Sequence, residues 1–462
     1  METATLATPV DAPAPARTAA AAPAPAGGSR LGWLDVLRGL AALAVVYHHA
    51  GFYVLTGAHR NSDRWLAAGV FGTTLFFLIS GYIIPASLER KGSLRGFWIS
   101  RVFRLYPLWI VAIGAVALLD RTDHYAVTAD DAYLHQHPGS VLLSHATMLQ
   151  DLLNVPAPIG AMWSLSYEMV FYCLISGLFV LRTHRASPRI ALLIVAAGAV
   201  LVPTLPYATL SRHLGTLPVA GVAAAVFGAG LLAATSGVRP VATVGALSLA
   251  GLAVVLLYGN RGYPWDGLLI PAYMFVGTTI YRAQTGQLRA RTAAAVALVV
   301  LGVVAVSDAL HAGRLHTDAD GRLVEQRHWI GAVLAAAACF GVGLLLRHRP
   351  MPGLLRRLGE ISYSVYLLHL VLLSLLTRQL TRFGVDAGRD GTPMWQQVAA
   401  LVGVVIVVCL CAEATFRLVE RPAQRVGHRL AGWAQRRFGS DAGLFDPPER
   451  GSRGRRRRAV HS

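Results

Sequence analysis

Charged side chains are scarce in this chain of 462 residues. Asp, Glu, Lys and Arg together make up 14% of it, whereas hydrophobic residues make up 54%. An ordinary soluble domain carries about 25% charged residues. So few charges cannot cover the surface of a water-soluble globule of this size, and those present cluster between long apolar runs. The composition therefore predicts a polytopic helical membrane protein.

Lysine, acidic residues and cysteine are scarce as well. Lys91 is the only lysine among 42 basic residues, and 24 acidic residues leave a formal charge of +18. The preference for arginine suggests a high-GC bacterial genome, and the excess of positive charge is typical of cytoplasmic loops of membrane proteins. The four cysteines lie inside apolar runs without the spacing of metal ligands. We therefore predict no disulfide and no metal site.

Motifs of ATP-driven machines are absent from the sequence. It contains no Walker loop and no GxGxxG after a strand-like run, which counts against an ATP-driven pump. Residues 1–30 are rich in Ala, Pro and Thr and lack the basic n-region of a secretory signal. We expect them to form a disordered cytoplasmic tail, followed by a retained first membrane helix.

Apolar segments of membrane-spanning length recur from residue 33 onward. Gly and Pro interrupt some of those between 190 and 258, so their number is the least firm. The sequence predicts an all-α, polytopic transmembrane helix bundle of about 10–12 spanning helices in the plasma membrane. The segments lie near residues 33–54, 67–88, 104–120, 161–181, 190–208, 215–234, 240–258, 266–282, 292–310, 329–347, 361–380 and 396–418.

Loop charges predict the orientation of this bundle. Segment 89–104 has five basic residues and one acidic residue, and the stretch from Arg421 to Ser462 has eleven arginines and three acidic residues. The alternate connections, 121–160 and 311–328, carry acidic residues and histidines. By the positive-inside rule, both termini are expected in the cytoplasm.

Three regions follow from this organisation. The tail over 1–30 precedes a transmembrane domain over 31–423, and a basic cytoplasmic tail over 424–462 is expected to be disordered. The tail contains the run RGRRRR over residues 453–458. We expect this run to bind anionic lipid headgroups rather than nucleic acid.

The first predicted helix contains ionisable residues, which are costly in lipid and indicate a functional site. Asp35 and Arg38 are three residues apart and can pair on one face. Arg38 and His49 are eleven apart, which places them on one face and about 16 Å from each other. Arg38, a cation, followed along the helix by His49, a titratable base, would suit a long donor molecule that carries negative charge. Alternatively, the Arg38 side chain extends to the membrane surface and the histidines only form hydrogen bonds with neighbouring helices. His48 points about 100° away from His49 and is the weaker candidate.

Polar residues also stand out in the next two segments. Ser80-Gly81 in the second segment is typical of close helix packing. Arg101 and Arg104 lie one turn apart in the cytoplasmic link that leads into the third, where they could direct two guanidinium groups at a phosphate. Plain anchoring at the inner surface explains such a pair equally well.

Two later helices carry further candidates. The motif WSLSYE contains Trp163, Ser164 and Glu168, and its glutamate is expected in the outer half of the membrane. Glu168 either serves the site or pairs with a basic residue for structure. Tyr366 and His369 follow Ser362 at helical spacing, so this polar stripe lines a cavity or joins helices.

These residues, in this order, resemble the acyltransferase-3 family of integral membrane O-acyltransferases. The resemblance covers residues of about 31–181 and 358–423, and the region between them matches only as apolar helices. Members commonly have fewer spanning helices than the twelve segments counted here. The motifs are the pair Arg38-x10-His49 and the stretches FFLISGYI, RVFRLYP, WSLSYE, ISYSVYLLH and ERP.

The resemblance implies transfer of an acyl group, often acetyl from cytoplasmic acetyl-CoA, to a hydroxyl of a glycan or other natural product. It implies that His49 is catalytic and that Arg38, Arg101 and Arg104 bind the acyl-CoA. For the mechanism we expect Glu168, as a second catalytic residue, or a nearby Ser or Tyr to orient the imidazole or the acceptor. A secondary transporter of a small anionic or sugar-like solute is the alternative, since it shares the broken helices and intramembrane charges. Supporting roles for substrate or structure are expected of Asp35, His48, Ser80, Trp163, Ser164, Tyr366 and His369.

Overall fold

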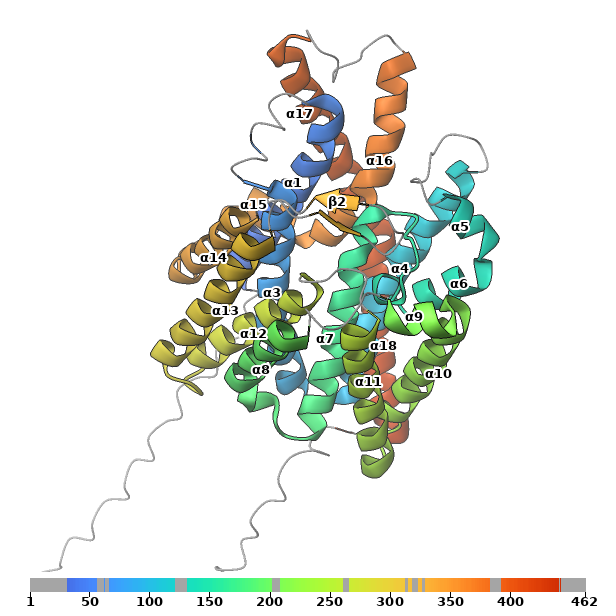
Figure 1. Cartoon of the computed structure of the whole chain (residues 1–462), viewed down its shortest axis with the longest axis vertical. Coiled ribbons are helices and arrows are strands. Elements are labelled where there is room, and N and C mark those ends of the chain that lie inside the picture. The colour runs from blue at the N-terminus through green and yellow to red at the C-terminus, as the bar shows by residue number, and fades with distance from the viewer. Residues whose placement is uncertain are drawn as a thin grey trace, which may run out of the picture.

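Nearly all residues that the structure describes lie in helices, which run side by side as a bundle (Figure 1). The computed structural model describes residues 31–55, 62, 66–120, 131–201, 208–260, 266–311, 315–317, 323–325, 329–382, 392–439 and 441. The long helices are α1 (Gly32–Val54), α3 (Ala68–Lys91), α4 (Leu94–Asp120), α7 (Trp163–Val180), α8 (Ser187–Leu201), α10 (Thr216–Ala234), α11 (Arg239–Gly259), α12 (Asp266–Gln284), α13 (Ala290–His311), α14 (Ile330–Leu345), α16 (Ser362–Arg382), α17 (Met394–Thr415) and α18 (Arg421–Phe438). Shorter elements are α5 (Asp131–Gln136), α6 (Pro138–Ala146), η1 (Asp151–Leu153), η2 (Gly160–Met162), η3 (His184–Ala186), α9 (Thr209–Leu214), α15 (Gly353–Glu360) and the π-helical η4 (Phe416–Glu420).

Each of the twelve predicted apolar segments overlaps one long helix, although residues 202–207 of one segment lie outside the described residues. Within the described part of the chain, seven helices are long and apolar enough to cross a membrane, and the bent pair α15–α16 would make an eighth. Helix α1 is not among them because Asp35, Arg38 and two histidines lower its hydropathy. The all-α polytopic bundle is thus confirmed, with fewer helices meeting this criterion than the 10–12 spans predicted.

One strand pair interrupts the helical pattern. Strands β1 (Leu315–Thr317) and β2 (Leu323–Glu325) pair antiparallel, with Leu315 opposite Glu325. They lie in the connection between α13 and α14, which the sequence identified only as a polar loop.

The start of the expected C-terminal tail is folded. Helix α18 continues α17 through η4, so residues 424–438 are helical rather than disordered. The many arginines of this segment suggested disorder, but one face of the helix packs against the bundle. Gly427 and Ala434 are buried on it, and Gly427 packs directly on Phe103 of α4. The expected tail over 1–30 and residues 442–462 lie outside the described residues.

Glycines allow α3 to lie close to α12, as the Ser-Gly pair predicted. A Cβ on Gly81 would lie 1.9 Å from the Met274 carbonyl oxygen, and one on Gly277 would lie 2.3 Å from that of Leu78. The Thr278 hydroxyl donates across this crossing to the Gly81 carbonyl at 2.8 Å. Small residues are what bring helices together in lipid, where burial of apolar surface drives little association.

A second close crossing fixes the start of α1 against α15. A Cβ on Gly359 would lie 1.8 Å from the Asp35 carbonyl oxygen. Directly after this crossing the chain bends by 68° from α15 into α16. The hydroxyl of Tyr363, on the first turn of α16, then donates to the Leu105 carbonyl of α4 at 2.8 Å. These contacts hold α1, α4 and α16 together around the residues described below.

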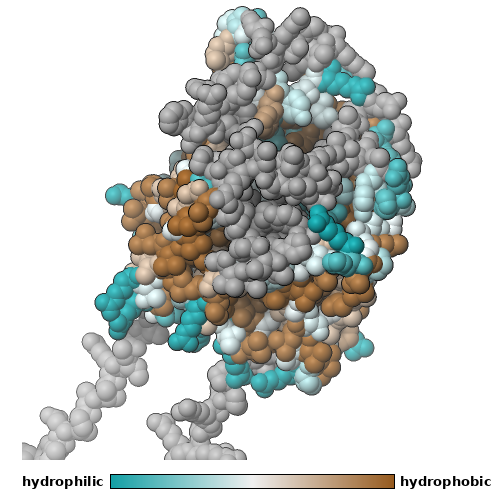
Figure 2. All heavy atoms as spheres, viewed as in Figure 1, coloured by the Kyte–Doolittle hydropathy of each residue, from teal (hydrophilic) through white to brown (hydrophobic). Residues whose placement is uncertain are grey.

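The outward faces of the bundle are apolar. Figure 2 shows hydrophobic side chains gathered over its sides and hydrophilic ones near the lower helix ends. The exposed fraction reaches 76% for Leu232 of α10, 68% for Leu298 of α13 and 78% for Leu345 of α14. Contiguous exposed apolar surface on this scale fits a lipid-facing surface.

Candidate active site

His49 lies on α1 and contacts a second histidine across the bundle. Its Nδ1 lies 3.0 Å from the Val45 carbonyl oxygen of the preceding turn and 3.1 Å from Nε2 of His369 on α16. The two rings are 5.0 Å apart, and the ring of His48 lies 5.0 Å from His49 on its other side. His48 itself packs against Gly69 of α3. The sequence left these histidines as unconnected candidates, and the structure brings His49 and His369 into contact.

A short polar network holds His369 in place. Its Nδ1 lies 2.7 Å from the Tyr366 carbonyl oxygen, and its side chain is only 1% exposed. The Tyr366 hydroxyl lies 2.7 Å from Ser164 Oγ and donates to the Ala161 carbonyl at 2.9 Å. The polar stripe on α16 and the start of the WSLSYE motif therefore meet each other directly beside His49.

Three arginines form a second group, at the other end of the polar face of α1. Arg38 has Arg101 and Arg104 of α4 as electrostatic neighbours, together with the carboxylates of Asp35 and Glu168. Asp35 is buried, at 5% exposure, and Arg38 and Arg104 are half-buried. This arginine cluster and its two neighbouring carboxylates come from residues as much as 133 positions apart in the sequence, from Asp35 to Glu168.

The three guanidinium groups of the arginine cluster have no bonding partner among the described residues: none donates a hydrogen bond or lies in an ion pair within 4 Å there. By contrast, the buried Arg282 and the half-buried Arg357 are bonded to described residues. Arg282 donates hydrogen bonds to Ser187, Gln287, Glu89 and the His184 carbonyl, and Arg357 is paired with Glu360 and Glu413. Unused donors of adjacent guanidinium groups are what a ligand with several anionic oxygens requires.

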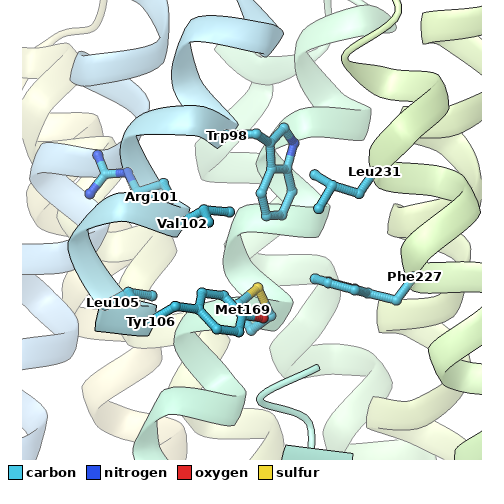
Figure 3. A pocket seen from close by; sticks show the side chains of 8 residues that line it. All are labelled: Trp98, Arg101, Val102, Leu105, Tyr106, Met169, Phe227 and Leu231. Carbon is cyan, nitrogen blue, oxygen red and sulfur yellow. The ribbon is translucent and has the colours of Figure 1, made fainter. Parts of the chain in front are cut away.

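Arg101 of this cluster also borders an apolar pocket between α4, α7 and α10. Figure 3 shows its guanidinium directed away from the pocket, which Trp98 and Phe227 line. The guanidinium lies over the rings of Phe97 and Tyr172, at 5.3 and 5.2 Å. These cation–π contacts hold the charge without using its hydrogen-bond donors.

Two glutamates lie beside the arginine cluster. Glu168 accepts a hydrogen bond from the Tyr172 hydroxyl and is an electrostatic neighbour of Arg38 and Arg104. Glu420 of η4 is 4% exposed and accepts hydrogen bonds from Ser364 Oγ at 3.0 Å and Gln424 Nε2 at 3.1 Å. Glu168 thus lies with the arginines, whereas His369 lies at hydrogen-bond distance from His49.

The remaining candidates are more peripheral. Ser80 is half-buried on α3, next to the Gly81 crossing. The indole of Trp163 lies edge-on to Phe77 and Tyr167, both at 6.0 Å. Among the described residues, no three His, Cys, Asp or Glu side chains are grouped so as to hold a metal ion.

Sequence reasoning missed Tyr172 and Glu420 as members of the site. Glu420 stands in the ERP motif, which reads as a helix stop beside the cytoplasm, but the helix continues and buries its carboxylate. A buried acid in an apolar helix is itself a signal of function. Tyr172 carries no such signal, because tyrosine is common in membrane helices.

Comparisons with known proteins agree with the motifs. The acyltransferase domain of the acyltransferase-3 family matches residues 31–413. A Bacillus subtilis (strain 168) protein, YrhL, provisionally named a peptidoglycan O-acetyltransferase, is 24% identical over 428 residues, which cover 86% of this chain and 55% of that protein. The peptidoglycan O-acetyltransferase OatA of Listeria monocytogenes is 29% identical over 180 residues, 35% of this chain and 26% of OatA. Nodulation protein 10 of Rhizobium leguminosarum bv. viciae is 28% identical over 179 residues, 36% of this chain and 48% of that protein.

The chain spans about half the length of the first of these relatives and less of the others. No solved structure matches it. The domain match covers most of the chain and includes both the arginine cluster and the two contacting histidines. This confirms the resemblance that the sequence motifs indicated: the chain belongs to the acyltransferase-3 family and carries its acyltransferase domain.

Proposed function

We propose that this protein is a multi-pass enzyme of a bacterial plasma membrane that transfers an acyl group, in the simplest case acetyl, from acyl-CoA to a hydroxyl of a sugar-containing acceptor. The observation that carries this proposal is a set of three guanidinium groups without bonding partners among the described residues, of which Arg38 lies on the same face of α1 as His49. In this reading Arg38, Arg101 and Arg104 bind the phosphates of CoA, and His49 is the catalytic base.

The dimensions of CoA support this arrangement. Arg38 and His49 are eleven residues apart on one helix, which corresponds to about 16 Å. The arm of CoA between its diphosphate and its sulfur has about twelve bonds, equivalent to about four extended residues or about 14 Å. A donor whose phosphates lie at the arginine cluster would therefore place its thioester near His49.

The reaction follows from the chemistry of an imidazole. His49 removes the proton from the acceptor hydroxyl while the oxygen of that hydroxyl attacks the carbonyl carbon of the thioester. The carbon–sulfur bond then breaks, and the proton passes to the sulfur of CoA. In an alternative order His49 first takes the acyl group and then passes it to the hydroxyl. Glu168 would position Arg38 and Arg104 through its charge in either case.

The membrane separates donor and acceptor in this proposal. The basic connections predict that the end of α4 nearest Arg101 faces the cytoplasm, where acyl-CoA is made. His49 lies farther along α1, toward the opposite side. Two of the relatives are named for O-acetylation of peptidoglycan, so a cell-surface glycan is the acceptor we infer, ahead of a secondary metabolite.

The direct test compares cell-surface glycans and small molecules from a deletion strain with those from its parent by mass spectrometry. We expect an acetylated species to disappear on deletion and to return with the wild-type protein, but not with His49→Ala. His213→Ala, at an exposed position on α9, is the matched control. A His49→Ala protein that restores acetylation at the normal level would contradict the proposal. Solute flux in vesicles without acyl-CoA would favour the transporter instead.

A further inference from the structure

His369 is buried in α16 and has defined neighbours at both ring nitrogens. Nδ1 lies 2.7 Å from the Tyr366 carbonyl oxygen, and Nε2 lies 3.1 Å from Nδ1 of His49. A carbonyl oxygen can only accept a hydrogen bond. Nδ1 of His369 therefore carries a hydrogen, and in the neutral ring Nε2 is an acceptor.

This arrangement determines the proton position on His49. Its Nδ1 faces two acceptors, the Val45 carbonyl oxygen at 3.0 Å and Nε2 of His369. Both contacts require a hydrogen on Nδ1 of His49, so Nε2 of its neutral ring has the lone pair. In water the opposite form, with the hydrogen on Nε2, also exists, and it could not act as a base through that atom.

We propose that His369 is a positioning residue that holds His49 in the form with Nδ1 protonated and Nε2 ready to accept a proton. This inference rests on the proposed function, since it assigns the base within that reaction. A catalytic histidine is usually oriented by a carboxylate, and here the neutral imidazole of His369 takes that place. Glu168 does not take this role, because it is bonded to Tyr172 beside the arginine cluster.

The proposal also accounts for the charge that develops during transfer. When Nε2 of His49 takes the hydroxyl proton, the new oxygen–carbon bond forms and the carbon–sulfur bond breaks. The imidazolium then donates from Nδ1 to Val45 and His369, and its Nε2 proton passes to the sulfur of CoA. The neutral imidazole of His369 thus stabilises the cation on His49 by accepting this hydrogen bond.

The surrounding contacts keep His369 in this orientation. Tyr366 lies one turn before it on α16, and its hydroxyl is fixed by Ser164 and the Ala161 carbonyl. The aromatic ring of Phe76 lies 5.6 Å from that of Tyr366. Because Nδ1 of His369 is bonded to the Tyr366 carbonyl, rotation of the His369 ring away from His49 would break that hydrogen bond.

Two variants of the full-length protein in liposomes separate this role from simple packing. His369→Leu fills similar space without an acceptor, whereas the side-chain carbonyl introduced by His369→Gln can lie where Nε2 lies. We expect kcat with acetyl-CoA to fall about 100-fold in His369→Leu and less than about tenfold in His369→Gln, with KM for acetyl-CoA unchanged in both. Equal kcat losses in the two variants, or none in His369→Leu, would overturn the proposal.

A second measurement does not depend on activity. Solid-state NMR of the protein with ¹⁵N-labelled histidine rings, assigned with His49→Ala, reports which nitrogen of His49 carries the hydrogen. We expect Nδ1 protonated and Nε2 unprotonated in the wild type, and a mixture of both forms in His369→Leu. A protonated Nε2 in the neutral wild type would refute the inference. If the spectrum agrees but no acetyl transfer occurs, the proposed function fails and the positioning of the ring stands.

Discussion

Replacing Arg104 by glutamine tests the role of the arginine cluster in binding CoA. Its guanidinium donates no hydrogen bond to any described residue, so the substitution leaves no described bonding partner unpaired. Each hydrogen bond from a charged group to CoA phosphate is worth about 1.5–3 kcal/mol. Loss of one such bond should weaken CoA binding by about 10- to 150-fold, at about 1.4 kcal/mol for each factor of ten.

The assay for this prediction is equilibrium binding to the purified protein in detergent. We compare CoA with pantetheine, which has the same arm and thiol but lacks the nucleotide and the diphosphate. Arg104→Gln should weaken binding of CoA and leave that of pantetheine unchanged. Arg189→Gln, at an exposed position on α8, is the control and should change neither. An Arg104→Gln protein that binds CoA within twofold of the wild type would refute the assignment of Arg104.

Three further predictions concern stability. Gly81→Ala should destabilise the protein by about 1–3 kcal/mol, measured by unfolding in detergent, because its Cβ would lie 1.9 Å from a backbone oxygen of α12. Arg282→Gln should cost about 3–5 kcal/mol by leaving Glu89 with an uncompensated charge, and exposed Arg289→Gln should cost almost nothing. Burial lowers the pKa of His184 in the connection between α7 and α8, so the folded state disfavours its protonation. The melting temperature should therefore fall as the pH drops below about 6.5, and His184→Gln should reduce that fall; an unchanged pH dependence in this variant would contradict the assignment.

The helices could be predicted from the sequence because lipid requires long apolar segments. Each predicted segment overlaps a helix, and the segment over 33–54 differs from α1 by only one residue at its start. The α18 helix could not be predicted in the same way. Its arginines suggested a disordered tail, and its order is explained by contacts with α4 that are distant in the sequence, among them the packing of Gly427 on Phe103 and the hydrogen bond from Arg95 to the Ala434 carbonyl.

The site could be predicted in part. Spacing on one helix places Arg38 and His49 on one face, because helical geometry is local. The contact between His49 and His369 joins residues 320 positions apart, and no local rule gives it. The position of Glu168 was open for the same reason, since its neighbours Arg38 and Arg104 come from other helices.

The central claim is that one donor molecule extends from the arginine cluster to His49. A structure of the protein with CoA bound tests it most directly. We expect the phosphates of CoA within hydrogen-bond distance of Arg38 and Arg104, and its sulfur within reach of Nε2 of His49. Phosphates bound elsewhere, or a His49 ring that faces lipid with no path to the arginines, would contradict it.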